Sequence, residues 1–273
     1  MRFKDALPDI QRLSIVAAVI MLAFSLTQLV TFTPQQISIE VFGILLDFSL
    51  NFSTLTIFLT AVLAAAGMEW LIQSHPDYGT LPTRWFSIRH WIVPVLTTLV
   101  IGVALDNFSG GPLWWSFFGL GSLLLMAVFV AEYNVVHAGD ENHPLATIGL
   151  TALSFALFLL LALSVYSANL RLYIRLPLLI LGSVAVISRS LYLRLGEWQP
   201  IWALVSSLIV SEIAIGFHYL PVTPPQFGLI LVGIAYALTS IITGIKESRR
   251  EWALWAEPVG MLSLLLIVSV FWF

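Results

Sequence analysis

Apolar stretches long enough to cross a bilayer alternate with short polar segments along the whole chain. A bilayer core of about 30 Å requires roughly 20 apolar residues in a helix. The stretches run approximately over Arg12–Phe32, Phe52–Gln73, His90–Asp106, Leu113–Val136, Leu145–Ser167, Leu172–Tyr192, Ile201–Tyr219, Gln226–Ile245 and Trp252–Phe273. This pattern predicts an all-α polytopic membrane protein with about nine transmembrane helices, in a single transmembrane domain over residues 1–273.

The eight stretches after the first group into four helical hairpins, which begin near Asn51, Pro112, Leu172 and Pro225. Their spacing of about 50 to 60 residues is compatible with an internal repeat. Similar short segments containing Trp occur where the chain re-enters the membrane from the cytoplasmic side, but any helix that starts at the membrane interface favours Trp. The sequence leaves both readings open.

The segment 37–50 is too short and too polar to span a membrane. Pairing it across Phe42-Gly43 places Ile37, Ile39 and Val41 opposite Phe48, Leu46 and Ile44 on one face. Glycine in a two-residue turn favours a β-hairpin. We therefore expect a short amphipathic β-hairpin on the outer face of the membrane, with a short interfacial helix as the alternative.

Composition supports the membrane class and narrows the partners. Of the 273 residues, 59% are hydrophobic and only 10% are charged, whereas soluble domains carry about 25% charged residues. The low charge also argues against disorder, and 12 basic residues with a net charge of -3 argue against nucleic acid as a partner. The expected partners are membrane lipids, with other membrane subunits or self-association as further possibilities.

Positive charges and tryptophans indicate the orientation. With the N-terminus inside, nine crossings place ten of the 12 Lys and Arg residues on the cytoplasmic side and only Arg171 and Arg175 outside, as the positive-inside rule requires. All ten Trp residues fall near expected helix ends, where interfacial rings prefer to lie. We expect a multi-pass protein of a bacterial cytoplasmic (inner) membrane, with its C-terminus outside.

Few ionisable residues lie at membrane depth, and these are candidates for pairing or function. Arg175 and Arg189 stand fourteen residues apart in the sixth stretch, one in each leaflet. The carboxylates at matching depths predict an outer pair of Arg175 with Glu212 and an inner pair of Arg189 with Glu132 or Glu69. Snorkelling of both arginines to headgroups is the alternative.

The seventh stretch is the most polar, with Ser207, Ser211 and His218 on one helical stripe. One hypothesis is a small substrate-binding pocket that opens outward, formed by Glu212, His218, Tyr219, Arg171 and Arg175. The other is close helix packing, which small residues on membrane helices favour. The small-residue runs 64–67 and 119–121 are also interpreted as packing surfaces.

Familiar catalytic and metal-binding motifs are absent from the sequence. It contains no zinc-binding His-Glu-x-x-His pair, no Gly-x-Ser-x-Gly elbow, no phosphate-binding Gly-x-x-x-x-Gly-Lys loop and no cysteine. We therefore assign no catalytic residue, no metal and no cofactor.

Three functions remain as hypotheses. The first is a non-enzymatic membrane component that binds lipid or other membrane subunits. The second is a small-solute or ion transporter with a polar site between the sixth and seventh helices. The third is an intramembrane enzyme acting on a lipid-linked substrate at the outer face, in which Glu212 or His218 would be the acid or base and Arg171 and Arg175 would hold phosphate.

Overall fold

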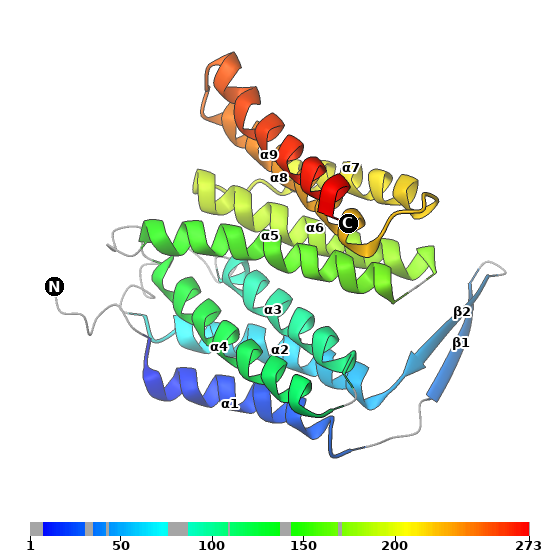
Figure 1. The fold of residues 1–273 in the computed structure, drawn as a ribbon. Helices are drawn as coiled ribbons and strands as arrows, with labels where there is room; N and C mark the ends of the chain where they lie inside the picture. Colours follow the sequence, from blue (N-terminus) through cyan, green and yellow to red (C-terminus); the bar gives the residue numbers. More distant parts are fainter. Residues whose placement is uncertain are drawn as a thin grey trace. The chain divides into compact units, whose positions relative to one another are not determined.

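The residues that the computed structural model describes contain nine helices and two short strands (Figure 1). These residues are 8–30, 35–41, 44–75, 87–108, 110–136, 143–168 and 171–272. The helices are α1 (Ile10–Leu26), α2 (Phe52–Ile72), α3 (Ile88–Asp106), α4 (Pro112–Asn134), α5 (His143–Ser167), α6 (Leu172–Leu195), α7 (Pro200–His218), α8 (Pro224–Lys246) and α9 (Glu251–Trp272). Each helix overlaps one predicted stretch, so the predicted helical segments are confirmed.

Seven of these helices, α2 to α8, are long and apolar enough to cross a membrane. Two apolar helices are shorter than these seven candidate spans. They are α1, with 17 residues, and the described apolar part of α9, Leu254–Ser269. The chain therefore has the architecture of a polytopic helical membrane protein. Nine crossings remain a prediction.

Local side-chain bonds explain where several helices begin and end. Asp9 and Asn51 accept hydrogen bonds from first-turn N–H groups of α1 and α2, and Thr223 forms a reciprocal capping box with Gln226 at α8. The helix α1 ends six residues before the predicted Phe32. Both the N–H and the hydroxyl of Thr27 donate to the carbonyl oxygen of Phe24, so the last turn tightens and the helix stops.

Two strands lie between α1 and α2. The strands β1 (Gln35–Val41) and β2 (Ile44–Leu50) pair antiparallel, with Ile39 opposite Leu46 and Val41 opposite Ile44. The amphipathic character of this segment and its place on an outer membrane surface remain predictions.

The chain divides into two compact units, Met1–His143 and Pro144–Phe273. In the first unit, side chains from all four helices form one apolar core that includes Phe24 of α1, Met68 of α2, Ile101 of α3 and Phe129 of α4. The predicted hairpin of α2 and α3 is a closely packed pair within this unit. The prediction of a single transmembrane domain concerns how the units associate and remains a prediction.

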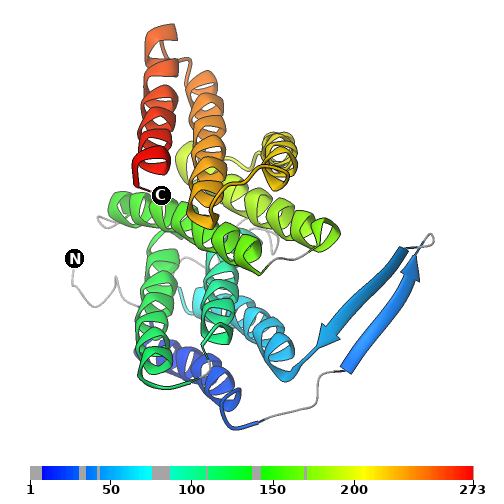
Figure 2. The ribbon, with the colours of Figure 1, turned by 45° about the vertical axis from the view of Figure 1, so that its right-hand side comes forward.

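The second unit is built on two packed helical hairpins and α5. The pairs α6–α7 and α8–α9 each pack along their length, and α8 and α9 lie side by side in both views (Figure 1 and Figure 2). Aromatic rings join α5 to α8, because Tyr166 lies 4.5 Å from Phe227 and Phe155 lies 5.4 Å from Tyr236 between ring centroids. Three of the four predicted hairpins are thus packed pairs inside a unit.

Candidate functional site

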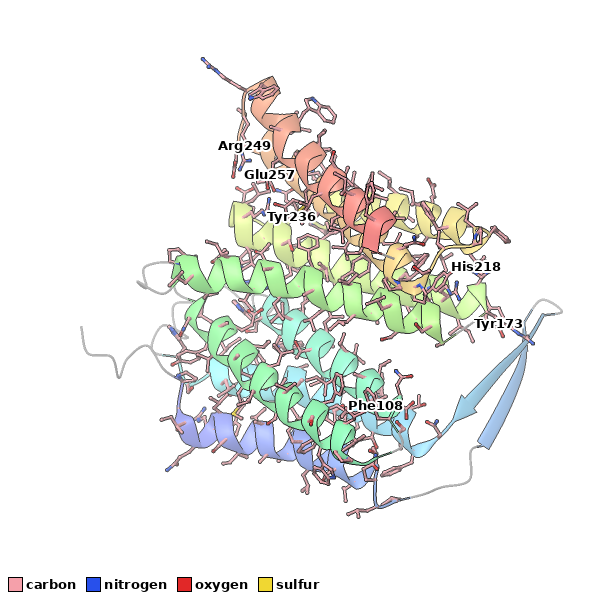
Figure 3. The ribbon with its side chains drawn as sticks, viewed as in Figure 1. Phe108, Tyr173, His218, Tyr236, Arg249 and Glu257 are labelled. Carbon is pink, nitrogen blue, oxygen red and sulfur yellow. The ribbon has the colours of Figure 1, made fainter. Side chains whose placement is uncertain are left out.

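The predicted outer site has a buried arginine and a histidine in contact. Arg175, in the first turn of α6, is only 4% exposed. Its Nη1 lies 2.7 Å from Nδ1 of His218, the last residue of α7, which Figure 3 labels. The guanidinium carbon stands 4.8 Å from the ring centroid of Tyr166 on α5. Three helices of the second unit therefore meet at Arg175.

The other residues predicted for this site lie outside the contact. Arg171 and Glu212 are exposed, and Tyr219 is 75% exposed with its ring 5.1 Å from that of His218. The structure does not bring Glu212 to Arg175. Residues 212 and 218 are six positions apart, so their side chains point about 120° apart around the helix. The contact with His218 therefore turns Glu212 away.

The serine stripe of α7 supports the packing interpretation. Ser207 and Ser211 are buried, and their hydroxyls donate to the carbonyl oxygens of Ala203 and Leu208, each at 2.8 Å. Such bonds within the helix satisfy hydroxyl groups in an apolar environment. These serines make no bond toward a pocket.

The two inner carboxylates make separate polar contacts in the first unit, Glu132 fully buried and Glu69 partly buried. Glu132 on α4 is fully buried, and its Oε2 is 2.9 Å from Nδ1 of His90, which is 1% exposed. The Nε of Arg89 donates to Nε2 of His90 at 3.3 Å, so the imidazole hydrogen is on Nδ1 and is donated to Glu132. Glu69 on α2 accepts a bond from Nε1 of Trp91 at 3.2 Å.

Arg189 on α6 is fully buried and lies 5.5 Å from the ring centroid of Tyr192. It belongs to the second unit, whereas Glu132 and Glu69 belong to the first. Its pairing with either carboxylate therefore remains a prediction.

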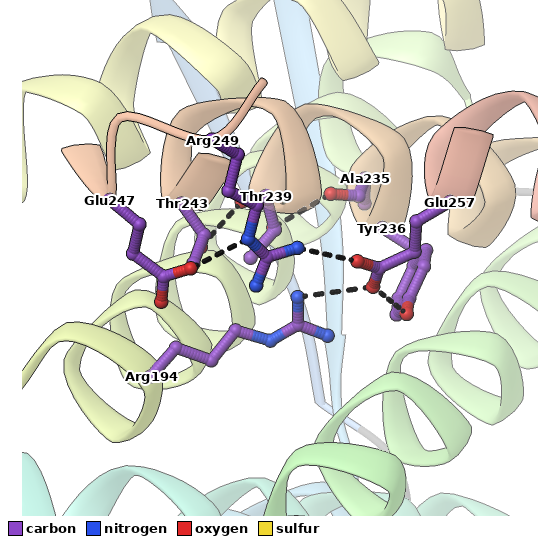
Figure 4. Close-up of polar contacts among 8 residues, drawn as sticks. All are labelled: Arg194, Ala235, Tyr236, Thr239, Thr243, Glu247, Arg249 and Glu257. Carbon is purple, nitrogen blue, oxygen red and sulfur yellow. Dashed lines mark hydrogen bonds and ion pairs between the residues drawn. The ribbon is translucent and has the colours of Figure 1, made fainter. Parts of the chain in front are cut away.

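The second unit contains a polar network around Glu257 that the sequence did not predict. Glu257 on α9 accepts hydrogen bonds from Tyr236 at 2.6 Å and Arg249 at 3.1 Å, and lies 3.4 Å from Arg194 (Figure 4). Arg249 also pairs with Glu247 at 2.6 Å, and this bond raises the pKa of the Arg249 guanidinium above its ordinary value. Glu257 is the only charged residue of the last apolar stretch. A lone carboxylate in such a stretch indicates a buried partner, and this was the sequence signal for the network.

A groove lies along one face of α2. Its cavity volume is about 380 Å³, and its lining is Val62, Ala65, Ala66, Glu69, Trp70, Gln73 and Trp91. The spacing of the α2 residues places them on one continuous helical stripe. A second groove of about 240 Å³ between α1 and α2 shares Ala66 and Trp70. The small side chains thus leave a groove on α2 that is polar at the end formed by Glu69 and Gln73.

No three His, Asp or Glu side chains within the described ranges are arranged to hold a metal ion. Chemically, the described residues offer a buried polar pair of His90 and Glu132, a buried Arg175 whose Nε has no hydrogen-bond partner, and a groove on α2 with a polar end. The seven long apolar helices define the class of the protein, a polytopic helical membrane protein.

The chain belongs to the family described as "protein of unknown function (DUF5656)", whose model matches residues 32–272. Comparison with curated proteins gives no match, and comparison with solved structures gives none.

Proposed function

We propose that this protein is a non-enzymatic membrane component that binds a glycerophospholipid in the α2 groove. The observation that carries the proposal is the groove itself, whose volume of about 380 Å³ falls in the range of ligand sites. The apolar part is formed by Val62, Ala65 and Ala66, and the polar part by Glu69 and Gln73. An acyl chain with a polar headgroup matches this division.

The length of the groove favours a lipid of one leaflet. From Val62 to Gln73 the helix rises about 16 Å, which is about half the thickness of a bilayer core. Trp70 and Trp91 border the polar end, as expected at a headgroup level. Arg12 adds a positive charge at this end, because its Nη1 donates to the carbonyl oxygen of Trp70 at 3.1 Å. We infer that the headgroup lies beside these residues.

The substitution Ala66→Trp tests the groove. Ala66 is exposed and lines both cavities, so an indole ring there occupies the lipid's space without entering the core. We expect the variant to retain phospholipid about tenfold less tightly, equivalent to ~1.4 kcal/mol. Native mass spectrometry of the detergent-purified protein measures the retained phospholipid directly.

Leu55→Trp is the matched control for Ala66→Trp. Leu55 is 60% exposed and lies on the same stripe of α2, eleven residues away and outside the groove. We expect this variant to retain phospholipid like the wild type. Equal retention by both variants would refute the groove as the lipid site. Loss of a copurifying membrane protein instead of lipid would assign the surface to a subunit interface.

We also propose that all nine helices cross a bacterial cytoplasmic membrane, with the N-terminus inside, the C-terminus outside and the 37–50 hairpin on the outer surface. The uneven distribution of Lys and Arg supports this orientation. A reporter that is active only in the cytoplasm should signal when fused before residue 8 and be silent when fused after residue 273. Signals from both fusions would mean an even number of crossings and contradict the proposed topology.

A further inference from the structure

Arg175 is a buried cation without an acidic partner among the residues that the structure describes. Its contacts are the hydrogen bond to Nδ1 of His218 and the ring of Tyr166. The Nε atom is buried and has no hydrogen-bond partner. A buried charge is costly unless it is paired, so this guanidinium has a strong physical preference for an anion.

The unused donors are arranged for a bidentate ligand. Because Nη1 is engaged by His218, the Nε–H and the Nη2–H groups on the adjoining edge are left over, and neither bonds to a described residue. This edge presents two parallel N–H groups, which match two oxygens of a phosphate or carboxylate group. His218 must accept through Nδ1, since a guanidinium only donates. The imidazole thus fixes the orientation of the free edge.

The surroundings of Arg175 also favour negative charge. It lies in the first turn of α6, at a helix N-terminus where the helix dipole attracts anions. The side chain of the N-cap residue Arg171 makes no capping bond, and it adds an exposed positive charge one turn away. The end of α5 at Tyr166 and the end of α7 at His218 meet the start of α6 here. The site is therefore near the ends of the helices, at headgroup depth.

We propose that Arg175 binds a phosphate group through Nε and Nη2, with His218 as a positioning residue. The phosphate belongs either to a lipid headgroup or to a free phosphate ion, since both present the same oxygens. This site lies in the second unit, and its existence does not depend on the lipid groove of α2.

Binding to the delipidated protein in a phosphate-free non-ionic detergent tests the site. One arm measures radiolabelled inorganic phosphate by equilibrium dialysis, and the other measures short-chain phosphatidylglycerol by native mass spectrometry. We expect the wild type to bind in one arm, which identifies the source. Arg175→Lys should bind at least about tenfold more weakly, because an ammonium group cannot offer two parallel N–H groups.

Matched variants separate binding from folding. Arg250→Gln removes an exposed positive charge that follows the end of α8 and lies outside the site, so this variant should bind within about threefold of the wild type. His218→Leu should weaken binding, and His218→Gln should restore it in part, since its amide oxygen can accept from Nη1. The ligand should raise the melting temperature of the wild type but not of Arg175→Lys. Absence of binding in both arms, or wild-type binding by Arg175→Lys, would overturn the proposal.

Discussion

Replacing Glu132 with alanine is expected to lower the apparent melting temperature of the detergent-solubilised protein by ~5–10 °C. Glu132 and His90 are both essentially excluded from solvent, with 2.9 Å between Oε2 and Nδ1. Truncation removes the acceptor of the imidazole N–H in a place that water cannot reach. Breaking a buried polar pair of this kind costs about 3 kcal/mol. Thermal unfolding followed by intrinsic tryptophan fluorescence measures the shift.

Two variants control this experiment. Glu132→Gln keeps an oxygen that can accept from His90, so it should melt between the alanine variant and the wild type. Glu212→Ala removes an exposed carboxylate of α7 and should shift the melting temperature by less than about 2 °C. If Glu132→Ala melts together with Glu212→Ala, the His90–Glu132 contact does not stabilise the fold.

The positions of the helices could be predicted because the bilayer imposes a length on each apolar stretch. The start of α2 at Phe52 and its end at Ile72 agree with the predicted Phe52–Gln73 to within a residue. The length rule does not determine the end of α1, where the hydroxyl and N–H groups of Thr27 close the last turn on Phe24. Local hydrogen bonds of this kind compete with apolar continuity and are weakly encoded in composition.

The candidate site was predictable in depth but not in facing direction. Counting residues along helices placed Arg175 and His218 at one level of neighbouring helices, and the structure joins them at 2.7 Å. Glu212 was predicted at the same level, yet the rotation of α7 about its axis leaves it exposed. Rotation depends on the packing of all neighbours, which a single sequence does not supply.

Long-range pairing explains the missed network. Glu257 is bonded by Tyr236 on α8 and lies beside Arg194 on α6, sixty-three residues away in the chain. A carboxylate inside an apolar stretch signals that some partner exists. Which cation reaches it depends on the packing of α6 against α8 and α9, so the pairing could not be read from local patterns.

The small-residue runs show the same limit at the scale of a single turn. A Cβ added at Gly121 would lie 3.0 Å from a side-chain atom of Ile101, whereas one at Gly119 would meet nothing within 4 Å. The two glycines are two residues apart and therefore point about 160° apart, on nearly opposite faces of α4. Composition identified both as packing positions, but only the one that faces the core has that role.

Gly67 provides the strongest test of packing by small residues, and we expect Gly67→Leu to lower the apparent melting temperature by ~5 °C or more. A Cβ at this position would lie 2.3 Å from Cγ1 of Val16 on α1, far inside van der Waals contact. Val16 is β-branched and 8% exposed, so it cannot rotate away easily. The helices α1 and α2 would have to separate.

Gly119→Leu is the matched control, because it makes the same change on a helix surface where a Cβ meets no neighbour. Leucine favours a helix over glycine, so this variant should melt at the wild-type temperature or slightly above it. Melting of both variants in detergent, followed by tryptophan fluorescence, distinguishes the two positions. A Gly67→Leu protein as stable as Gly119→Leu would mean that α1 does not pack closely on α2. The groove between α1 and α2, which Gly67 also lines, would then need a different explanation.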